Sequence, residues 1–541
     1  MQTDQKKDVG QPVLSETAAP AQATVKCTHL LAALLSGGAT VFAFAPFNVW
    51  LVQILALAAL FFMALRTAGN RATFLLGWAF GFAAIAAGTH WLYVSMHDFG
   101  GLPAPLAVMA VVLLALSLGL IYGAALTTAS WLARRLPDQA RAAPLFALLL
   151  LPACWILADW IRGWIFTGFP WLATGYAHTA SPLAGFAPLV GVYGLTGLAA
   201  LMAACIALLM KKNQRGIAQK IALALLVFLP IGGIALHSVQ WTTPQGQVLS
   251  VRLLQGNVPQ DLKFDPAQLA RTLILYQHMI REAPADLIAT PETALPVFAH
   301  QLPQDYLDDL AAFSQESGSR ILLGVPWTTA PGRYLNSVVG LSDGQLSYRY
   351  DKHHLVPFGE FIPPGARWFI DLMHIPLGDF GRGDEVQAPF KTKDQWVLPN
   401  ICYEDLFGEE IAAQLNAAHQ RGSPVASILL NVSNIAWFGD SIALPQHLQI
   451  SQMRALETGR PMLRATNTGA TAVIDARGKL TASLPASTRA SLKAQVQGMQ
   501  GRTPYIVMGN SVPVGLAALI LAAIWLVSRR DRKITQRKSA I

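Results

Sequence analysis

Three residues that lie far apart in the sequence have the side chains of a base, a cation and a nucleophile. Glu292 stands in "DLIATPETALP", Lys352 in "YRYDKHHLVPFGE" and Cys402 in "NICYED". Each follows a short apolar run and is therefore predicted to lie where a core strand ends. A lone acid or lysine there is usually a solvated loop residue, and a lone cysteine usually belongs to the core. Together, the three residue types predict catalysis by an activated thiol.

The acidic residues that follow Cys402 need an explanation, because nearby negative charge disfavours the thiolate that attacks. They are Glu404, Asp405, Glu409 and Glu410. If Glu292 lies within hydrogen-bond reach of the thiol, it removes the proton during the attack, and no resting thiolate is needed. We expect Asp405, Glu409 and Glu410 to form the first turn of the following helix, where acidic side chains suit the helix dipole.

Lys352 and Glu292 are predicted to supply the charges of the reaction. Lys352, directed at the carbonyl oxygen of a substrate, would stabilise an oxyanion together with a backbone N–H near Cys402. The apolar neighbours of Glu292, "LIAT" and "ALP", are expected to raise the pKa of its carboxyl toward the range of a useful base.

The composition is that of a membrane protein. Of the 541 residues, 53% are hydrophobic and 13% are charged, and the mean hydropathy is +0.39. The formal net charge of +9 does not come from basic residues gathered on one soluble face, so no nucleic-acid partner is expected. The cysteines show no CxxC spacing, so we expect no metal site, no disulfide framework and no cofactor. Those other than Cys402, namely Cys27, Cys154 and Cys205, are predicted to be small buried apolar residues.

Long apolar runs dominate the chain up to about residue 240. Residues 1–27 are polar and are predicted to be a disordered cytoplasmic tail. A helix that crosses a bilayer needs ~20 apolar residues. Seven spans are therefore predicted within 28–240, near 28–46, 48–65, 72–93, 104–133, 143–161, 184–210 and 220–237, and an eighth near 512–528. Residues 506–541 are assigned to this eighth span and a basic cytoplasmic tail.

The distribution of Lys and Arg predicts the orientation of these spans, because positive charge is retained on the cytoplasmic side. With the N-terminus inside, the only basic residue of the outer connections is Arg162. The inner connections hold Arg66, Arg71, Arg134, Arg135, Arg141, Lys211, Lys212, Arg215 and Lys220. An odd number of spans then places residues 241–505 outside the cytoplasm.

Residues 241–505 are predicted to form one α/β domain. Apolar runs such as "RILLGVP" and "ASILLNVSN" alternate with amphipathic segments. In 265–280, Asp265 is suited to cap a helix whose apolar residues share one face. Strands that are apolar throughout are normally covered on both faces, so we expect sheets sandwiched between helices.

The three candidate residues resemble the Glu-Lys-Cys triad of the nitrilase, or carbon–nitrogen hydrolase, superfamily. Within it, the words "TPETALP", "DKHHLVPFGEF" and "NICYED", placed between seven spans and one, are similar to the apolipoprotein N-acyltransferase family. Residues 160–176, "WIRGWIFTGFPWLATGY", resemble the signature of that family between its fifth and sixth spans. The resemblance covers about residues 28–528. It implies a polytopic helical membrane protein that carries an extracytoplasmic nitrilase-like αββα sandwich.

The resemblance also implies a function. Members of the family move an acyl chain from a phospholipid, such as phosphatidylethanolamine, through a cysteine thioester to the α-amine of S-diacylglyceryl-cysteine in a lipoprotein. This ping-pong transfer is the last step of bacterial lipoprotein maturation. It implies an inner-membrane enzyme with its catalytic domain on the periplasmic side. Nothing in the sequence calls for more than a monomer.

Further residues acquire expected roles from the same resemblance. Glu360 is a supporting acid that holds Lys352 or the intermediate, and Tyr403 with Glu404 shapes the pocket. Phe264 stands where some members have Trp. Asn434, Trp437, Phe438 and His447 either line the acyl or head-group pocket or belong to the core. The apolar loop residues expected to exclude water are Phe358, Phe361, Ile362, Trp368, Phe369, Ile370, Leu372 and Met373.

Two other functions fit parts of the sequence. One is a membrane-anchored amidase or nitrilase that hydrolyses small C–N substrates, which requires a wet, polar pocket and fewer spans. The other is a transporter or receptor with an external binding domain. The predicted spans hold few of the mid-membrane charges that a transport pathway requires.

Overall fold

The computed structural model describes residues 26–136, 144, 146–211, 216–362 and 380–539. Most of the predicted tail therefore lies outside the described residues. So do Arg141, Lys212 and Arg215 of the predicted inner connections, and Trp368, Phe369, Ile370, Leu372 and Met373 of the predicted water-excluding loop.

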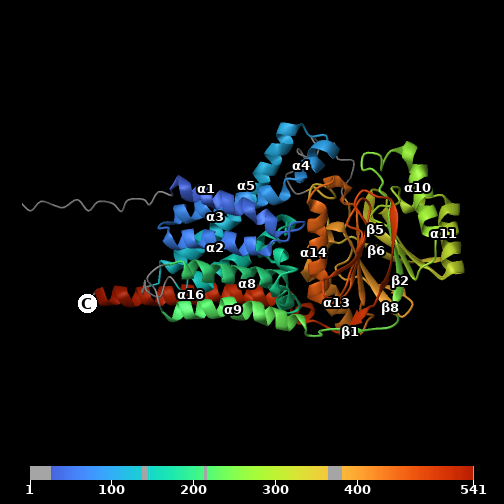
Figure 1. The fold of residues 1–541 in the computed structure, drawn as a ribbon. Coiled ribbons are helices and arrows are strands. Elements are labelled where there is room, and N and C mark those ends of the chain that lie inside the picture. The colour runs from blue at the N-terminus through green and yellow to red at the C-terminus, as the bar shows by residue number, and fades with distance from the viewer. Residues whose placement is uncertain (1–25, 137–143, 145, 212–215, 363–379, 540–541) are drawn as a thin grey trace, which may run out of the picture.

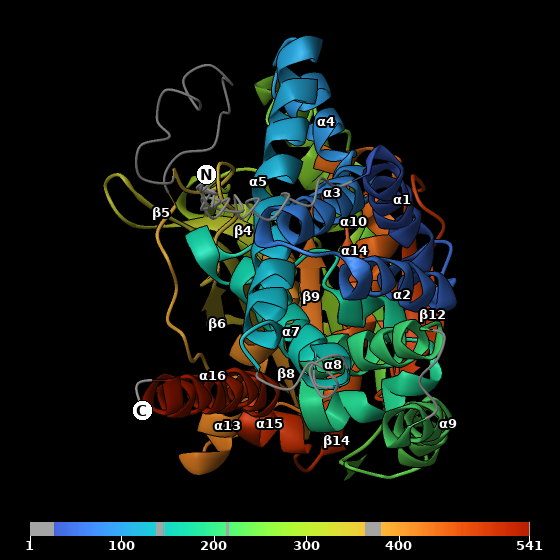
Figure 2. The same ribbon diagram turned by 90° about the vertical axis from the view of Figure 1, so that its left-hand side faces the viewer.

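Helices gather at one end of the molecule and sheets at the other (Figure 1). The helices of the first region are α1 (Cys27–Ala39), α2 (Trp50–Arg66), α3 (Asn70–Thr89), α4 (Leu92–Val94), α5 (Ala104–Ala133), α7 (Leu151–Arg162), α8 (Ala187–Leu209) and α9 (Ile217–His237). After the sheets, α15 (Pro504–Met508) leads into α16 (Ser511–Ser539), which returns to the helical end beside α8 and α7 (Figures 1 and 2).

Five helical segments in the described part of the chain are long and apolar enough to cross a membrane. They are Asn70–Thr89, Ala104–Ala133, Pro182–Leu209, Ile217–His237 and Ser511–Arg530. Two shorter apolar helical segments, Cys27–Ala43 and Trp50–Arg66, also coincide with predicted spans. The predicted span near 143–161 corresponds to a π-helical turn, Phe146–Leu150, followed by α7.

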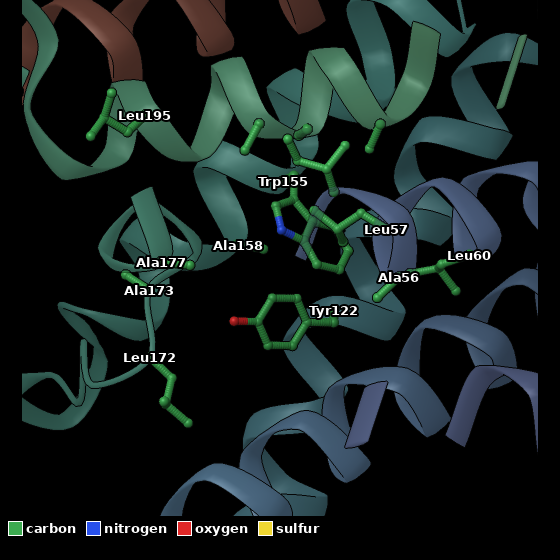
Figure 3. Packing of buried hydrophobic residues seen from close by; sticks show 14 of the residues in the cluster. Ala56, Leu57, Leu60, Tyr122, Trp155, Ala158, Leu172, Ala173, Ala177 and Leu195 are labelled. Atoms are coloured by element: carbon green, nitrogen blue, oxygen red, sulfur yellow. The ribbon is translucent and has the colours of Figure 1, made fainter. Parts of the chain in front are cut away.

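The interior of the helical region is held by close packing of small and aromatic residues. Glycines let α3 and α5 approach closely, since a methyl group on Gly77 would lie 2.6 Å from the Tyr122 carbonyl oxygen. The rings of Tyr122 and Trp155 have centroids 4.9 Å apart, and Leu57 belongs to the same buried cluster (Figure 3). This packing brings α2, α5 and α7 into one core.

Two six-stranded sheets form the other end of the molecule. The first has the order β13-β2-β3-β4-β5-β6 and the second β12-β11-β10-β9-β8-β7. Neighbours are parallel within β2-β3-β4 and within β8-β9-β10, and antiparallel elsewhere. The first sheet contains β13 (Ala490–Val496), β2 (Leu249–Gln255), β3 (Leu287–Ala289), β4 (Arg320–Ala330), β5 (Arg333–Ser342) and β6 (Gln345–Asp351). The second contains β12 (Leu480–Ser483), β11 (Ala472–Ile474), β10 (Met462–Thr466), β9 (Ile428–Ser433), β8 (Gln395–Ile401) and β7 (Phe390–Thr392). A separate pair joins β1 (Thr243–Pro244) and β14 (Met499–Gln500).

Helices cover the outer faces of both sheets, as predicted for continuously apolar strands. The first sheet is covered by α10 (Pro266–Arg281) and α11 (Gln304–Ser317), and the second by α13 (Gly408–Gln420) and α14 (Ala443–Thr458) (Figure 1). The predicted cap of α10 is present, because the Asp265 side chain accepts the Ala267 N–H at 2.9 Å. The result is the four-layered αββα sandwich.

The α14 helix joins the sandwich to the helical region. It lies between the two ends of the molecule (Figure 1), and its apolar residues Ile450, Met453 and Leu456 belong to the same buried cluster as the membrane-type helices. The Glu457 carboxylate accepts the Val192 N–H of α8 at 2.8 Å. The second sheet is thereby seated directly on the helical region.

Candidate active site

The three candidate residues lie at strand ends, as predicted. Lys352 directly follows β6, Cys402 directly follows β8, and Glu292 lies in the loop after β3. Cys402 begins a 3-10 helix, Cys402–Leu406, with a φ of 52°. A positive φ is uncommon for a residue with a Cβ and is characteristic of strained functional turns. The sharp turn presents the sulfur beyond the edge of the second sheet.

Side chains from both sheets meet at this edge. Lys352 Nζ lies 3.2 Å from Glu292 Oε1, and the Cys402 thiol donates a hydrogen bond to the same carboxylate. Glu292 and Lys352 are 6% and 1% exposed. The nucleophile, the carboxylate and the ammonium group therefore lie within direct reach of one another.

The pKa of Glu292 differs in sign from the prediction. Burial on its own raises it, but the Lys352 ammonium, the amide of Asn336 and the Asn434 N–H, with Lys263 nearby, together hold the pKa below its ordinary value. Asn336 Nδ2 and the Asn434 N–H both donate to this carboxylate at 2.8 Å. The apolar sequence neighbours were a poor guide, because cations and donors from distant segments dominate. Glu292 is consequently ionised at neutral pH and ready to accept a proton.

Burial and the charges of the site also set the states of the other two groups. Burial and the neighbouring Glu292 raise the pKa of the Cys402 thiol, with Lys352 opposing them, so the sulfur rests as a protonated thiol. Burial lowers the pKa of Lys352, but Glu292 and Glu360 outweigh it and raise that pKa above its usual value. The resting site therefore holds a thiol, a carboxylate and an ammonium group, which is the state that attack assisted by a base requires.

Glu360 and Asn336 hold Lys352 and Glu292 in place. Glu360 Oε1 accepts from Lys352 Nζ and from Asn336 Nδ2, each at 2.8 Å, while Glu360 Oε2 accepts the Val356 N–H at 2.8 Å. Asn336 thus bridges the two carboxylates. Sequence reasoning missed Asn336, although a single amide within the apolar strand β5 was a signal that could have drawn attention to it.

Tyr403 and Glu404 contact the scaffold and do not line the cavity around Cys402. The Tyr403 hydroxyl donates to the Gly168 carbonyl at 2.7 Å, which ties the turn after Cys402 to the helical region. The Glu404 carboxylate accepts the N–H groups of Ile401 and His353, both at 2.6 Å. Glu404 therefore fastens together the backbone on either side of Cys402 and Lys352.

Asp405 does not lie in the first turn of the helix, contrary to the prediction. It is part of the 3-10 helix, is fully buried, and pairs with Arg464 NH1 at 3.0 Å. A buried carboxylate needs such a partner, and Arg464 comes from β10, far along the chain. Glu409 and Glu410 do lie in the first turn of α13, as predicted.

A cavity of about 590 Å³ opens beside Cys402, Glu292 and Lys352. Phe264, Asn434, Trp437 and Phe438 line it, as do Pro296, Val297, Phe298, Tyr334 and Phe380. Phe358 is 41% exposed and lies outside this lining. His447 is buried against the Trp171 ring, with centroids 5.4 Å apart, and belongs to the core. Outside the charged cluster, the wall is mostly apolar and suits a hydrocarbon chain.

The helical region contributes to the same cavity. Ser95 and Gly100, from the segment between α4 and α5, form part of its wall. Trp437 packs on Phe99 with ring centroids 6.0 Å apart, and Phe438 packs on Trp91 at 4.4 Å. The reactive groups thus face a chamber built jointly by the sandwich and by the end of the helical region.

The segment 160–176 forms the base of this junction. Arg162 is fully buried beside Asp159 at 3.4 Å and donates to the Phe169 and Trp171 carbonyl oxygens at 2.5 Å. These bonds satisfy the backbone of an irregular turn and fix its shape. Outside the turn, Trp164 and Phe166 are 72% and 86% exposed, as expected for aromatic residues at a membrane interface.

The cysteines other than Cys402 play no part in the site. Cys154 and Cys205 are buried as predicted, whereas Cys27 is exposed at the first turn of α1, because nothing in the described structure covers that end of the helix. Among the described residues, no group of three or more His, Cys, Asp or Glu is arranged to hold a metal ion.

Comparison with known proteins agrees with this architecture. The carbon–nitrogen hydrolase family model matches residues 250–505, so the sandwich and its site belong to that class. The model of the apolipoprotein N-acyltransferase N-terminal domain matches residues 36–205.

Whole-chain relatives then define the family more narrowly. An apolipoprotein N-acyltransferase of Ralstonia nicotianae is 46% identical over 93% of both chains, and one of Nitrosomonas europaea is 46% identical over 94% of this chain and 99% of its own. One from Bordetella bronchiseptica is 43% identical over 93% of this chain and 97% of its own. The chain belongs to the apolipoprotein N-acyltransferase family.

Proposed function

We propose that this chain moves a fatty acyl chain from a phospholipid to the N-terminal α-amine of S-diacylglyceryl-cysteine in a lipoprotein, the last step of bacterial lipoprotein maturation. The observation that carries the proposal is the thiol, carboxylate and ammonium cluster in an apolar chamber walled by both the sandwich and the helical region. Relatives that match almost the whole chain bear the name of this activity.

The first half-reaction loads the enzyme. The Cys402 sulfur attacks the ester carbonyl of the phospholipid while Glu292 accepts the thiol proton, and a C–S bond forms. The Lys352 ammonium and a backbone N–H near Cys402 stabilise the oxyanion. The ester C–O bond then breaks, and the departing lysophospholipid alcohol takes the proton from Glu292. The acyl chain remains on Cys402 as a thioester.

The second half-reaction transfers the chain. The neutral α-amine of the acceptor attacks the thioester, and Glu292 accepts a proton from the nitrogen. A C–N amide bond forms and the C–S bond breaks, after which the proton passes to sulfur and restores the thiol. Glu292 acts as base and then as acid in each half, which suits a carboxylate that is ionised at rest.

The surrounding residues receive supporting roles in this proposal. Glu360 holds Lys352, while Tyr403 and Glu404 fix the turn that carries the nucleophile. Phe264, Trp437 and Phe438 contact the bound lipid. Phe358, Phe361 and Ile362 shield the thioester from water at the membrane surface, because hydrolysis would turn a transferase into a phospholipase.

The membrane arrangement is part of the proposal. Residues 28–240 and 506–541 contribute eight spans, residues 241–505 form the catalytic domain, and residues 1–27 precede the first span. The basic connections favour a cytoplasmic N-terminus and a periplasmic catalytic domain in a bacterial inner membrane. We propose that the enzyme acts as a monomer with phosphatidylethanolamine as donor.

A membrane-anchored amidase shares the catalytic design but fits the chamber less well. A small polar C–N substrate requires a wet, polar pocket, whereas aromatic and aliphatic side chains make up most of this wall. A transporter or receptor would have no use for a base and an ammonium group around a buried thiol.

The two half-reactions provide the test. The purified full-length chain is incubated with phosphatidylethanolamine labelled in its acyl chain, separated from lipid, and given a diacylated lipopeptide. We expect lysophospholipid to be released in the first step and labelled N-acyl lipopeptide in the second. Release of the label only as free fatty acid, whether or not the lipopeptide is present, would contradict a transferase and favour the hydrolase.

A further inference from the structure

Lys263 is a second lysine of the active site, and sequence reasoning overlooked it beside Phe264. It lies in the turn between β2 and α10, is 3% exposed, and lines the same cavity as Cys402. Lys263 Nζ donates to the backbone carbonyl oxygen of Glu292 at 3.1 Å. It thus approaches the catalytic carboxylate from the chamber without forming an ion pair with it.

The charge of Lys263 has no direct counter-ion. Among the described residues no carboxylate lies within ion-pair distance of its ammonium group, whereas Lys352 contacts both Glu292 and Glu360. The Glu292 carboxylate oxygens are occupied by Lys352, Asn336 and Asn434. A buried cation that contacts only a neutral oxygen is costly to maintain unless a ligand supplies the missing negative charge.

The pKa of Lys263 reflects this situation. Burial lowers it to about 8, even though Glu292 and Cys402 both act to raise it. The other charged groups around the chamber are Lys352, which is cationic, and Glu360, which is already paired with Lys352. The ammonium form still prevails at neutral pH, and an anion bound next to it would stabilise that form further.

We propose that Lys263 binds the phosphate of the phospholipid donor while the ester carbonyl of that lipid lies against Cys402. This inference rests on the proposed function and adds the group that recognises the head of the donor. In a glycerophospholipid the phosphodiester is separated from the ester by the short glycerol unit. A cation in the same chamber as the nucleophile is therefore suitably placed. The phosphate takes part in no covalent step; it is held by charge and hydrogen bonding.

A purely structural role is the competing explanation. The bond from Lys263 to the Glu292 carbonyl could serve only to position the base. A positioning role would affect every acyl donor equally. A phosphate-binding role would affect only donors that carry a phosphate.

The test compares two acyl donors with full-length protein in detergent. One is phosphatidylethanolamine, and the other is p-nitrophenyl palmitate, an uncharged ester. For Lys263→Met we expect kcat/KM for self-acylation by the phospholipid to fall roughly tenfold to hundredfold, mainly through KM, as for loss of one charge-assisted hydrogen bond. With the uncharged ester we expect a change of less than about threefold, which is within the range of indirect effects. Lys263→Arg should restore most of the phospholipid activity, and Lys479→Met, an exposed lysine, serves as the matched control.

A measurement on the unmodified protein keeps the test independent of folding. Glycerol 3-phosphate should inhibit the reaction of p-nitrophenyl palmitate competitively in the wild-type enzyme and more weakly in Lys263→Met. Equal losses with the two donors, or no inhibition by glycerol 3-phosphate of the wild type, would overturn the role of Lys263. Failure of the wild type to accept any phospholipid, with the uncharged ester still reacting, would instead reject the proposed function.

Discussion

Glu292→Gln removes the proposed base with the least change of shape. The amide keeps an oxygen for the Asn336 Nδ2 or Lys352 Nζ donor, both of which now contact Glu292 Oε1. Lys352 retains Glu360 at 2.8 Å, so its charge stays compensated. Losing one charge-assisted hydrogen bond costs about 1.5–3 kcal/mol of folding free energy, which a large domain tolerates. We therefore expect a folded protein with an impaired reaction.

The size of the kinetic effect follows from the state of the thiol. Burial and Glu292 raise the pKa of Cys402, so almost no thiolate exists at neutral pH and attack depends on the base. Removing general base catalysis slows the reaction by about 10²–10⁴-fold. We expect the rate of acylation of Cys402 by p-nitrophenyl palmitate to fall within that range. Glu282→Gln, a half-exposed acid paired with Arg252, is the control and should change little.

The pH dependence provides an independent check on the role of Glu292. The pKa of Glu292 lies below its ordinary value, so its carboxylate form, and the stability and catalysis that depend on it, are lost only as the pH falls through that lowered pKa. The wild-type rate should therefore be nearly flat from about pH 6 to about pH 9. In Glu292→Gln the rate should rise with pH, because the thiolate must form without a base. A normal acylation burst in this variant, or a flat profile, would refute the assignment.

Three other substitutions test the support around the site. Asn336→Leu leaves two buried carboxylates without their shared donor and should lower both self-acylation, by about tenfold, and the free energy of unfolding, by about 1–3 kcal/mol, measured by thermal denaturation. Arg464→Leu leaves Asp405 buried without its partner and should cost about 3–5 kcal/mol of stability; an unchanged melting temperature would contradict the buried pair. Tyr403→Phe loses only the bond to the Gly168 carbonyl and should cost about 1 kcal/mol while keeping acylation within a few-fold of wild type; a loss as large as that of Glu292→Gln would show that the hydroxyl acts in the chemistry.

Local patterns predicted much of the sandwich. The apolar runs around Leu253, Leu322 and Leu430 became strands because their burial is visible in the sequence itself. The cap at Asp265 and the acids of the α13 first turn follow from rules that act within a few residues. The ends of β6 and β8 could be located for the same reason, and they position Lys352 and Cys402.

Contacts between distant segments could not be predicted in this way. The pKa of Glu292 depends on Lys352, Asn336 and Asn434, which come from other strands and turns. Lys263 looked like a loop residue until the fold buried it beside the nucleophile. Asp405 suited a helix start by position, but a distant arginine took it into the core. Each of these outcomes depends on tertiary packing and not on the period or composition of a segment.

The most direct test of the central claim is the mass of the Cys402 peptide after the wild-type protein has met phosphatidylethanolamine with a defined acyl chain. We expect the mass of one acyl group on this peptide, its removal by hydroxylamine, and its absence from Cys402→Ser treated in parallel. Equal conversion of lipid by Cys402→Ser and the wild type, or an acyl group on another residue, would contradict a thioester mechanism at Cys402.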